Sequence, residues 1–148
     1  SLAKDKSLAL VIDAESDREV EVNADKIRLR QVMINLVNNA MKFTEKGQIT
    51  ICAHREENNV LISVKDSGIG IPADHLESVF QEFTQVDTTT TRKAGGTGLG
   101  LPISRRLISM HSGRLWAESS GINGEGSTFY VHLPIEANIN ENITLTAN

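Results

Sequence analysis

The sequence predicts a two-layer α/β sandwich, in which a mixed β-sheet packs against helices. Segments with the two-residue alternation of strands interleave with segments that have the longer period of helices. Some neighbouring strands are separated only by a short polar turn, such as Glu-Glu-Asn-Asn at residues 56–59. Such hairpin-like pairs argue against a purely parallel sheet and favour a mixed sheet in two layers.

The strands and helices can be predicted from the local pattern of apolar and polar residues. Strands are expected at residues 8–12, 19–22, 48–55, 60–65, 115–118 and 127–133, and helices at residues 25–43, 74–80 and 98–111. Asp25 is a suitable N-cap for the first helix, and Gly47 is expected to stop it. Gly113 is expected to close the last helix. The apolar residues of the first helix form one buried stripe: Leu29, Val32, Met33, Leu36, Val37 and Ala40.

Composition narrows the class of protein. The chain has 148 residues, about one domain with a core of its own. Fifteen Lys and Arg against nineteen Asp and Glu give a net charge of −4, so no basic excess indicates nucleic acid or an anionic membrane. No apolar run reaches the roughly 20 residues that span a bilayer, and no signal peptide opens the chain. We expect a cytoplasmic location for this segment, and leave open whether a longer parent is membrane-anchored. The single cysteine, Cys52, is expected to pack in the core.

A polar face on the first helix is the first candidate site. Asn35, Asn39 and Lys42 are spaced i, i+4 and i+7, so they share one side of the helix. Asparagine oxygens are neutral hard ligands suited to Mg²⁺, and a lysine supplies a point charge for phosphate. The alternative is a solvated helix face that happens to carry asparagines.

A glycine turn after an apolar strand is the second candidate. In Asp66-Ser67-Gly68-Ile69-Gly70, a carboxylate at the floor of an apolar pocket could accept from the exocyclic amine of adenine, where guanine has a carbonyl. The glycines permit close approach of the backbone to the base. The alternative is an ordinary strand-ending turn.

The third candidate is the glycine-rich loop that opens the last helix. Gly96, Gly98 and Gly100 would place backbone amides at a helix N-terminus, which suits a polyphosphate. No GxxxxGK[ST] motif is present, and no acidic residue stands where a dinucleotide-binding unit requires one. Taken together, the three candidates point to Mg-ATP.

These motifs resemble the catalytic and ATP-binding domain of sensor histidine kinases, within the gyrase-type ATPase superfamily, over roughly residues 8–134. The resemblance implies the Bergerat-type fold and a catalytic domain at residues 1–134. The polar composition of residues 135–148 predicts a tail or linker. The resemblance also implies that Asn39 is the Mg²⁺ ligand and that Thr128 helps to anchor Asp66. Phe80 and Phe83 match the phenylalanine box. The residues matching nucleotide-binding positions are Asn35, Asn39, Lys42, Phe43, Asp66, Gly68, Gly70, Gly96, Thr97, Gly98, Leu99, Gly100 and Thr128.

Two departures refine the function that the resemblance implies. Asn35 stands where the hydrolysing members carry a glutamate, and an amide cannot act as general base on water. Gln85 stands where many members place an arginine, so we take Arg92 as the candidate for the γ-phosphate, against a solvated loop arginine. No catalytic residue is assigned firmly, and Arg92 is a candidate only.

The implied activity is transfer of the γ-phosphate of ATP to a histidine on a dimerisation helical domain of the same parent, with a response regulator as an indirect partner. None of the four histidines here stands in an HE-x-x-x-P context, so this fragment should not phosphorylate itself. The alternatives are a gyrase-like hydrolase and a nucleotide-binding module without catalysis.

Overall fold

The computed structural model describes residues 7–12, 22–81 and 100–136. In chain order the elements are β1 (Ser7–Ile12), α2 (Lys26–Lys42), β2 (Lys46–Glu56), β3 (Asn59–Asp66), η1 (Ala73–His75), η2 (Ser78–Phe80), α4 (Gly100–Met110), β4 (Arg114–Ser119) and β5 (Ser127–Pro134).

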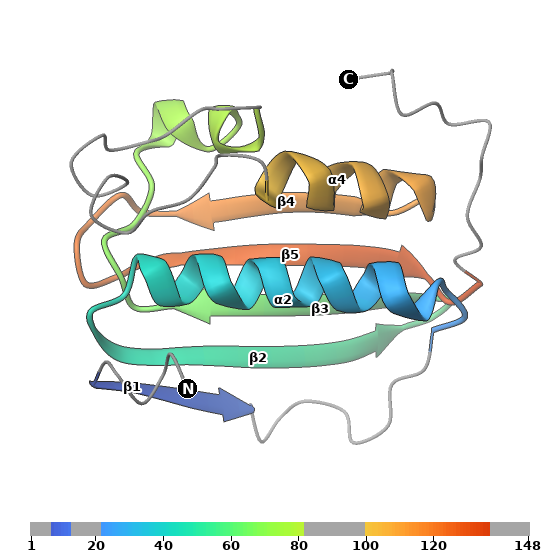
Figure 1. Cartoon of the computed structure of the whole chain (residues 1–148), viewed down its shortest axis with the longest axis horizontal. Coiled ribbons are helices and arrows are strands. Elements are labelled where there is room, and N and C mark those ends of the chain that lie inside the picture. Colours follow the sequence, from blue (N-terminus) through green and yellow to red (C-terminus); the bar gives the residue numbers. More distant parts are fainter. Residues whose placement is uncertain (1–6, 13–21, 82–99, 137–148) are drawn as a thin grey trace.

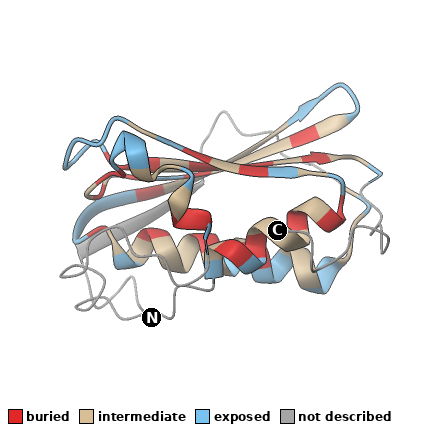
Figure 2. Ribbon diagram, turned by 90° about the horizontal axis from the view of Figure 1, so that it is seen from above, coloured by how far each residue is buried: buried red, intermediate tan, exposed pale blue. Residues whose placement is uncertain are grey.

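The sheet is mixed. Within the described residues it has five strands in the order β1-β2-β3-β5-β4. β1 pairs with β2 in parallel, and the other neighbours are antiparallel (Figure 1). Both α-helices lie on one side of the sheet, and the buried residues gather between the two layers (Figure 2). The predicted two-layer sandwich with a mixed sheet is confirmed.

Helix α2 forms as its sequence predicts. The Asp25 side chain accepts from the amide of Arg28 at 3.0 Å and caps the first turn. Val32, Leu36 and Ala40 are buried at helical spacing. The remaining stripe residues, Leu29, Met33 and Val37, are partly buried and pack against the same core. The stripe therefore faces the sheet and leaves the polar side of α2 available.

Strand β5 supplies the opposite wall of the core. Its residues alternate strictly, so that Phe129, Val131 and Leu133 are buried while their neighbours lie on the open face of the sheet. Phe129 meets Phe80 edge-on, with ring centroids 5.9 Å apart. This contact fixes the segment after β3 to the centre of the sheet.

The two helices run side by side and are joined at one end by His111. This histidine is 1% exposed; its Nε2 accepts from the amide of Asp25 at 3.2 Å and its Nδ1 lies 2.7 Å from the carbonyl of Leu107. The contact ties the end of α4 to the start of α2. This contact sets how α2 and α4 are aligned, and therefore which of their residues lie next to each other.

Residues 74–80 do not form the continuous helix that we expected. They form two 3₁₀ turns, η1 and η2, because their backbone hydrogen bonds close over three residues, as from the amide of Phe80 to the carbonyl of Glu77 at 3.1 Å. Val79 and Phe80 are both buried. The tighter turns bring these two neighbours into the core together.

Gly47 does not stop the first helix. The helix ends at Lys42 with Phe43 as its C-cap, and Gly47 already belongs to β2. Its φ is +121°, and a Cβ there would lie 2.1 Å from the Oγ of Ser67. The positive φ favours glycine at this position, and the absence of a Cβ leaves room for the Ser67 side chain.

Gly113 closes α4 in a different way from the one expected. The residue with positive φ is Ser112, at 60°, and the amide of Gly113 donates to the carbonyl of Ile108 at 2.9 Å, the pattern of a Schellman motif. A Cβ on Gly113 would lie 2.5 Å from the carbonyl oxygen of His132. Gly113 is needed for packing against β5, and Ser112 takes the left-handed position.

Three further expectations concern a predicted strand, the single cysteine and the chain after β5. Of the strand expected at residues 19–22, only Val22 lies within the described residues, and it is not in a strand. Cys52 is half-buried on the side of β2 opposite the buried Ile49, with its sulfur 2.9 Å from the Nε2 of His54. The expected core position for Cys52 is therefore wrong. Ile135 continues the ordered chain past β5, because its amide donates to the carbonyl of Asn58 at 2.8 Å.

Candidate functional site

The C-terminal half of α2 carries the predicted polar face. Asn35, Asn39 and Lys42 all lie within the helix, so their spacing places them on one side; the asparagines are half-buried and the lysine is exposed. The side-chain nitrogen of Asn35 donates to the Oγ of Ser104 on α4 at 3.2 Å, and Ser104 is fully buried. Asn39 has no such side-chain bond to another described residue. The structure therefore ties Asn35 to α4 and leaves the amide of Asn39 free toward the described part of the chain.

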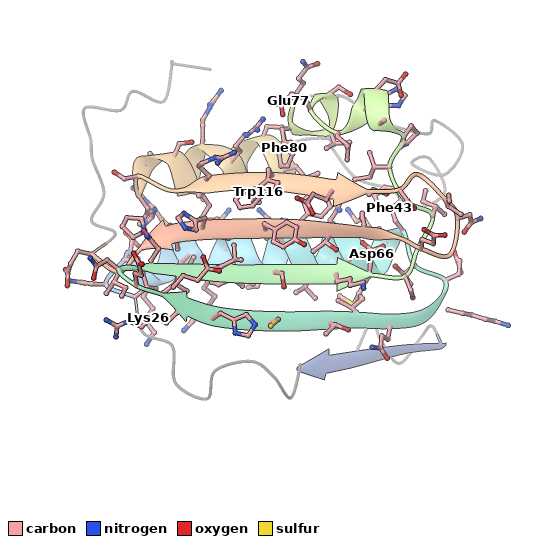
Figure 3. The ribbon with its side chains drawn as sticks, turned by 180° about the vertical axis from the view of Figure 1, so that it is seen from behind. Lys26, Phe43, Asp66, Glu77, Phe80 and Trp116 are labelled. Atoms are coloured by element: carbon pink, nitrogen blue, oxygen red, sulfur yellow. The ribbon has the colours of Figure 1, made fainter. Side chains whose placement is uncertain are left out.

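The end of α2 meets the turn that follows β3. The amide of Ile69 donates to the carbonyl of Phe43 at 3.2 Å. A Cβ on Gly68 would lie 2.1 Å from the same carbonyl oxygen, so only glycine fits. Phe43 and Asp66 accordingly lie at the same end of the molecule, opposite Lys26 (Figure 3). The amide face and the carboxylate, which are separate motifs in the sequence, belong to one region.

Asp66 is a buried carboxylate with its donors in place. It is 3% exposed, at the last position of β3. Its Oδ1 accepts from the amides of Gly68 at 2.9 Å and Ser127 at 3.3 Å, and its Oδ2 accepts from the Ser127 hydroxyl at 2.9 Å. Burial raises the pKa of Asp66 above its ordinary value of 3.8, although these hydrogen bonds act in the opposite direction. The site therefore holds an acceptor group that is costly to leave unpaired.

Two glycines make room for this arrangement. Gly126 has a φ of +68°, and a Cβ there would lie 1.8 Å from the carbonyl oxygen of Asp66. Because Gly126 has no side chain, the start of β5 comes close enough for Ser127 to reach the carboxylate of Asp66. Gly70 has a φ of +80° and is buried where the loop between β4 and β5 crosses the turn. Both positions need a residue that adopts the left-handed region without strain.

The residue that anchors Asp66 is Ser127, and the expected role of Thr128 is wrong. Inward residues of β5 have odd numbers, as buried Phe129 shows, so Thr128 projects from the other face of the sheet. There its hydroxyl bonds to Tyr130. The apolar Phe129 in the sequence carried this signal, because residues two apart in a strand share a face.

The other predicted residues are only partly placed. Gly100 begins α4, and a Cβ on it would lie 3.9 Å from the Cγ of Asn35, so the start of this helix adjoins the amide face. Phe80 is buried under the guanidinium of Arg105, which lies 4.3 Å from the ring centroid. Several expected residues lie outside the described part of the chain: Phe83, Gln85, Arg92, Gly96, Thr97, Gly98 and Leu99.

The described residues fit Mg-ATP by their chemistry. Within residues 7–12, 22–81 and 100–136, no group of three or more His, Cys, Asp or Glu could hold a metal. An ion here would therefore take amide oxygens such as that of Asn39, together with phosphate and water, which is a set that Mg²⁺ accepts. Lys42 adds a positive charge beside it, at the C-terminal end of α2.

None of the helices in the described ranges has the length and apolar character needed to cross a bilayer.

Comparison with known proteins shows the family. The family model described as histidine kinase-, DNA gyrase B- and HSP90-like ATPase matches residues 24–137. The autoinducer 2 sensor kinase/phosphatase LuxQ of Vibrio harveyi is 43% identical over 141 residues, which are 91% of this chain but only 16% of LuxQ.

Solved structures give the same result. The nucleotide-free catalytic domain of histidine kinase ThkA superposes with a TM-score of 0.75 at 31% identity, over 92% of this chain and 84% of that one. Full-length ShkA in complex with AMPPNP superposes with a TM-score of 0.77 at 31% identity, over 94% of this chain and 28% of ShkA.

The chain therefore belongs to the histidine kinase-, DNA gyrase B- and HSP90-like ATPases. Within that family it is a catalytic ATP-binding domain of the histidine-kinase type.

Proposed function

We propose that this domain binds Mg-ATP and donates the γ-phosphate to a histidine on a dimerisation helical domain of its parent, as a step in two-component signalling. The observation that supports this most is the buried carboxylate of Asp66 beside the amide face of α2. A carboxylate accepts hydrogen bonds only, and its remaining lone pairs suit an amine donor.

Base recognition is assigned to Asp66. Gly68 and Ser127 hold the carboxylate in one orientation through three hydrogen bonds. The exocyclic amine of adenine would donate to it, whereas guanine would oppose a carbonyl to the buried acceptor. An unpaired buried acceptor is costly, so ATP should be preferred strongly to GTP.

The phosphates and the metal are assigned to α2 and to the segment before α4. Asn39 is proposed as the Mg²⁺ ligand, with Asn35, Lys42 and Phe43 along the nucleotide. The bound ion would neutralise charge on the phosphates. We assign the polyphosphate to the glycine-rich residues Gly96, Thr97, Gly98, Leu99 and Gly100, and the γ-phosphate to Arg92 as a candidate.

A kinase is favoured over a hydrolase by the chemistry of Asn35. Its amide is held by Ser104 and cannot accept a proton from water. An unprotonated histidine nitrogen is already a nucleophile, so positioning and charge stabilisation suffice for transfer. The accepting histidine and the response regulator lie outside this chain, and a cytoplasmic location is part of the same proposal.

The first test is calorimetric titration of the domain with Mg-ATP and Mg-GTP, for the wild type and for Asp66→Asn. We expect a strong preference for ATP in the wild type. Asp66→Asn should weaken ATP binding by at least about tenfold or abolish the preference, because it replaces one acceptor oxygen by a donor. Equal affinities of the wild type for ATP and GTP would contradict the assignment.

A further inference from the structure

We propose that Ser119 is a positioning residue for base recognition: its hydroxyl holds the turn at residues 66–71 against the β4–β5 loop and so fixes the carboxylate of Asp66. The inference rests on the proposed function of Asp66. Ser119 is the last residue of β4 and does not itself contact the carboxylate.

The Ser119 hydroxyl is fully engaged. Its Oγ accepts from the amide of Ile71 at 2.9 Å and from the amide of Gly121 at 3.1 Å. It donates to the carbonyl of Gly126 at 2.7 Å. One hydroxyl thus uses its single proton and both lone pairs to join three backbone segments. Removing it would leave two amides and a carbonyl without this partner.

One of these three segments borders Asp66 directly, and a second ends the turn that begins there. Ile71 ends the turn that begins at Asp66, and Gly126 abuts its carbonyl oxygen so closely that no Cβ fits. Ser127, the next residue after Gly126, makes two of the hydrogen bonds to the carboxylate. A shift of Gly126 away from Ser119 would therefore carry Ser127 away from Asp66.

The β4–β5 loop makes a second contact with the same turn. The amide of Gly124 donates to the carbonyl of Gly68 at 2.8 Å. Gly68 in turn donates to the Oδ1 of Asp66. The turn is thus bound to the β4–β5 loop on both sides of its centre, and Ser119 is the side chain at this junction.

Ser120 provides a matched control. It is the adjacent residue and also bears a hydroxyl with two partners, donating to Glu125 at 2.8 Å and accepting from the amide of Ile122 at 3.3 Å. Both partners lie within the exposed loop, and neither makes a hydrogen bond to residues 66–71, although the amide of Ile122 lies near Gly70. Ser119→Ala and Ser120→Ala therefore each remove one serine hydroxyl, but only the hydroxyl of Ser119 is hydrogen-bonded to the turn that begins at Asp66.

The experiment titrates the whole chain with Mg-ATP and Mg-GTP for the wild type, Ser119→Ala, Ser119→Thr and Ser120→Ala. We expect Ser119→Ala to weaken ATP binding by about tenfold while GTP binding changes little, so that the preference for ATP falls. Ser119→Thr, which keeps the hydroxyl, should restore the preference, and Ser120→Ala should stay within about twofold of the wild type.

An equal loss of ATP and GTP affinity in Ser119→Ala would overturn the proposal, because it would indicate general damage to the site. Unchanged ATP binding in that variant, or an equal effect of Ser120→Ala, would overturn it as well. If Ser119→Ala does not fold, Ser119→Cys carries the same prediction, since its slightly larger thiol occupies the place of the hydroxyl and makes weaker hydrogen bonds.

Failure of the proposed function is distinguishable from failure of this inference. If the wild type binds neither nucleotide, the role of Asp66 in base recognition fails. The positioning role is then read from the protein alone, by the NMR titration of the Asp66 carboxyl in the wild type and Ser119→Ala. A changed titration midpoint supports the link from Ser119 to Asp66, and an identical one contradicts it.

Discussion

The hydroxyl of Ser127 donates to the Oδ2 of Asp66 at 2.9 Å, across 61 positions of the sequence, while the amide of the same serine reaches Oδ1. The contact joins the last residue of β3 to the first residue of β5 at the buried end of the sheet. It completes the carboxylate site, because one residue supplies two of its three hydrogen bonds.

Ser127→Ala should therefore affect nucleotide binding, whereas Thr128→Ala should not. The first change removes a hydrogen bond to a buried charge and should cost about 1–3 kcal/mol in ATP affinity. Thr128 lies on the opposite face of β5, so its replacement should change ATP affinity by less than about 0.5 kcal/mol. Calorimetry on both variants measures this difference, and a larger effect of Thr128→Ala would mean that the wrong face of β5 has been assigned to the site.

Acid should weaken ATP binding earlier than an ordinary aspartate would allow. Burial raises the pKa of Asp66 above 3.8, and the protonated carboxyl has lost an acceptor position for the adenine amine. ATP affinity should fall as pH decreases through this raised pKa. Titrations at a series of acidic pH values, with Asp66→Asn as the non-titrating control, check the effect. An identical pH dependence in both proteins would exclude Asp66 as its source.

Stability should follow the opposite direction with pH. The pKa of Asp66 is higher in the folded than in the unfolded chain, so its stabilising contribution is present below the unfolded value and is lost as pH rises through the folded one. The free energy of unfolding of the wild type, relative to that of Asp66→Asn, should therefore decrease as pH rises over this range. Urea unfolding of the two proteins without nucleotide measures it. A relative free energy that increases with pH would contradict the direction of the shift.

Gly126→Ala should be more damaging than Gly124→Ala. Both glycines have positive φ, at +68° and +96°, so both substitutions share a cost of about 1–2 kcal/mol from backbone conformation. A Cβ on Gly124 has nothing within 4 Å, whereas one on Gly126 would lie 1.8 Å from the carbonyl oxygen of Asp66. The clash should add about 1–3 kcal/mol to the loss. Urea unfolding of the two variants decides whether this close approach exists in solution, and equal losses would contradict it.

The metal ligand can be tested along α2. Asn39→Ala should weaken Mg²⁺-dependent ATP binding more than Asn38→Ala, because Asn39 lies between Asn35 and the buried stripe of α2, whereas Asn38 lies on the side of Asn35 that faces away from the stripe. Both changes remove an asparagine from the same helix, so their effects on helix propensity match. ATP titrations at saturating Mg²⁺ are the measurement. If the two variants bind alike, the helical-face argument is wrong.

The parts of the fold that depend on local pattern could be predicted from the sequence. The stripe of α2, its Asp25 cap and the alternation of β5 were readable because burial follows the period of each element. The turns η1 and η2 could not be predicted in this way, because the packing of Val79 and Phe80 against the core determines their geometry.

The site was only partly predictable for a similar reason. Asp66 and the amide face are marked by residue type and spacing, but the bond from Asn35 to Ser104 spans 69 positions and has no sequence pattern. The hydrogen bonds of Ser119 likewise depend on how two loops meet in space. Ser127 could have been found from the parity of Phe129, and was missed because the resemblance carried the anchoring role to the neighbouring threonine, Thr128.

The most direct test of the account is transfer of label from γ-labelled ATP. The domain is incubated alone and with the histidine-bearing helices of its parent, supplied separately. We expect no label on the domain alone, slow release of phosphate, and label on the helices at a low rate that rises with their concentration, since no tether holds the two together. Label on the domain itself, or brisk release of phosphate with none on the helices, would contradict a kinase domain that transfers to a separate histidine.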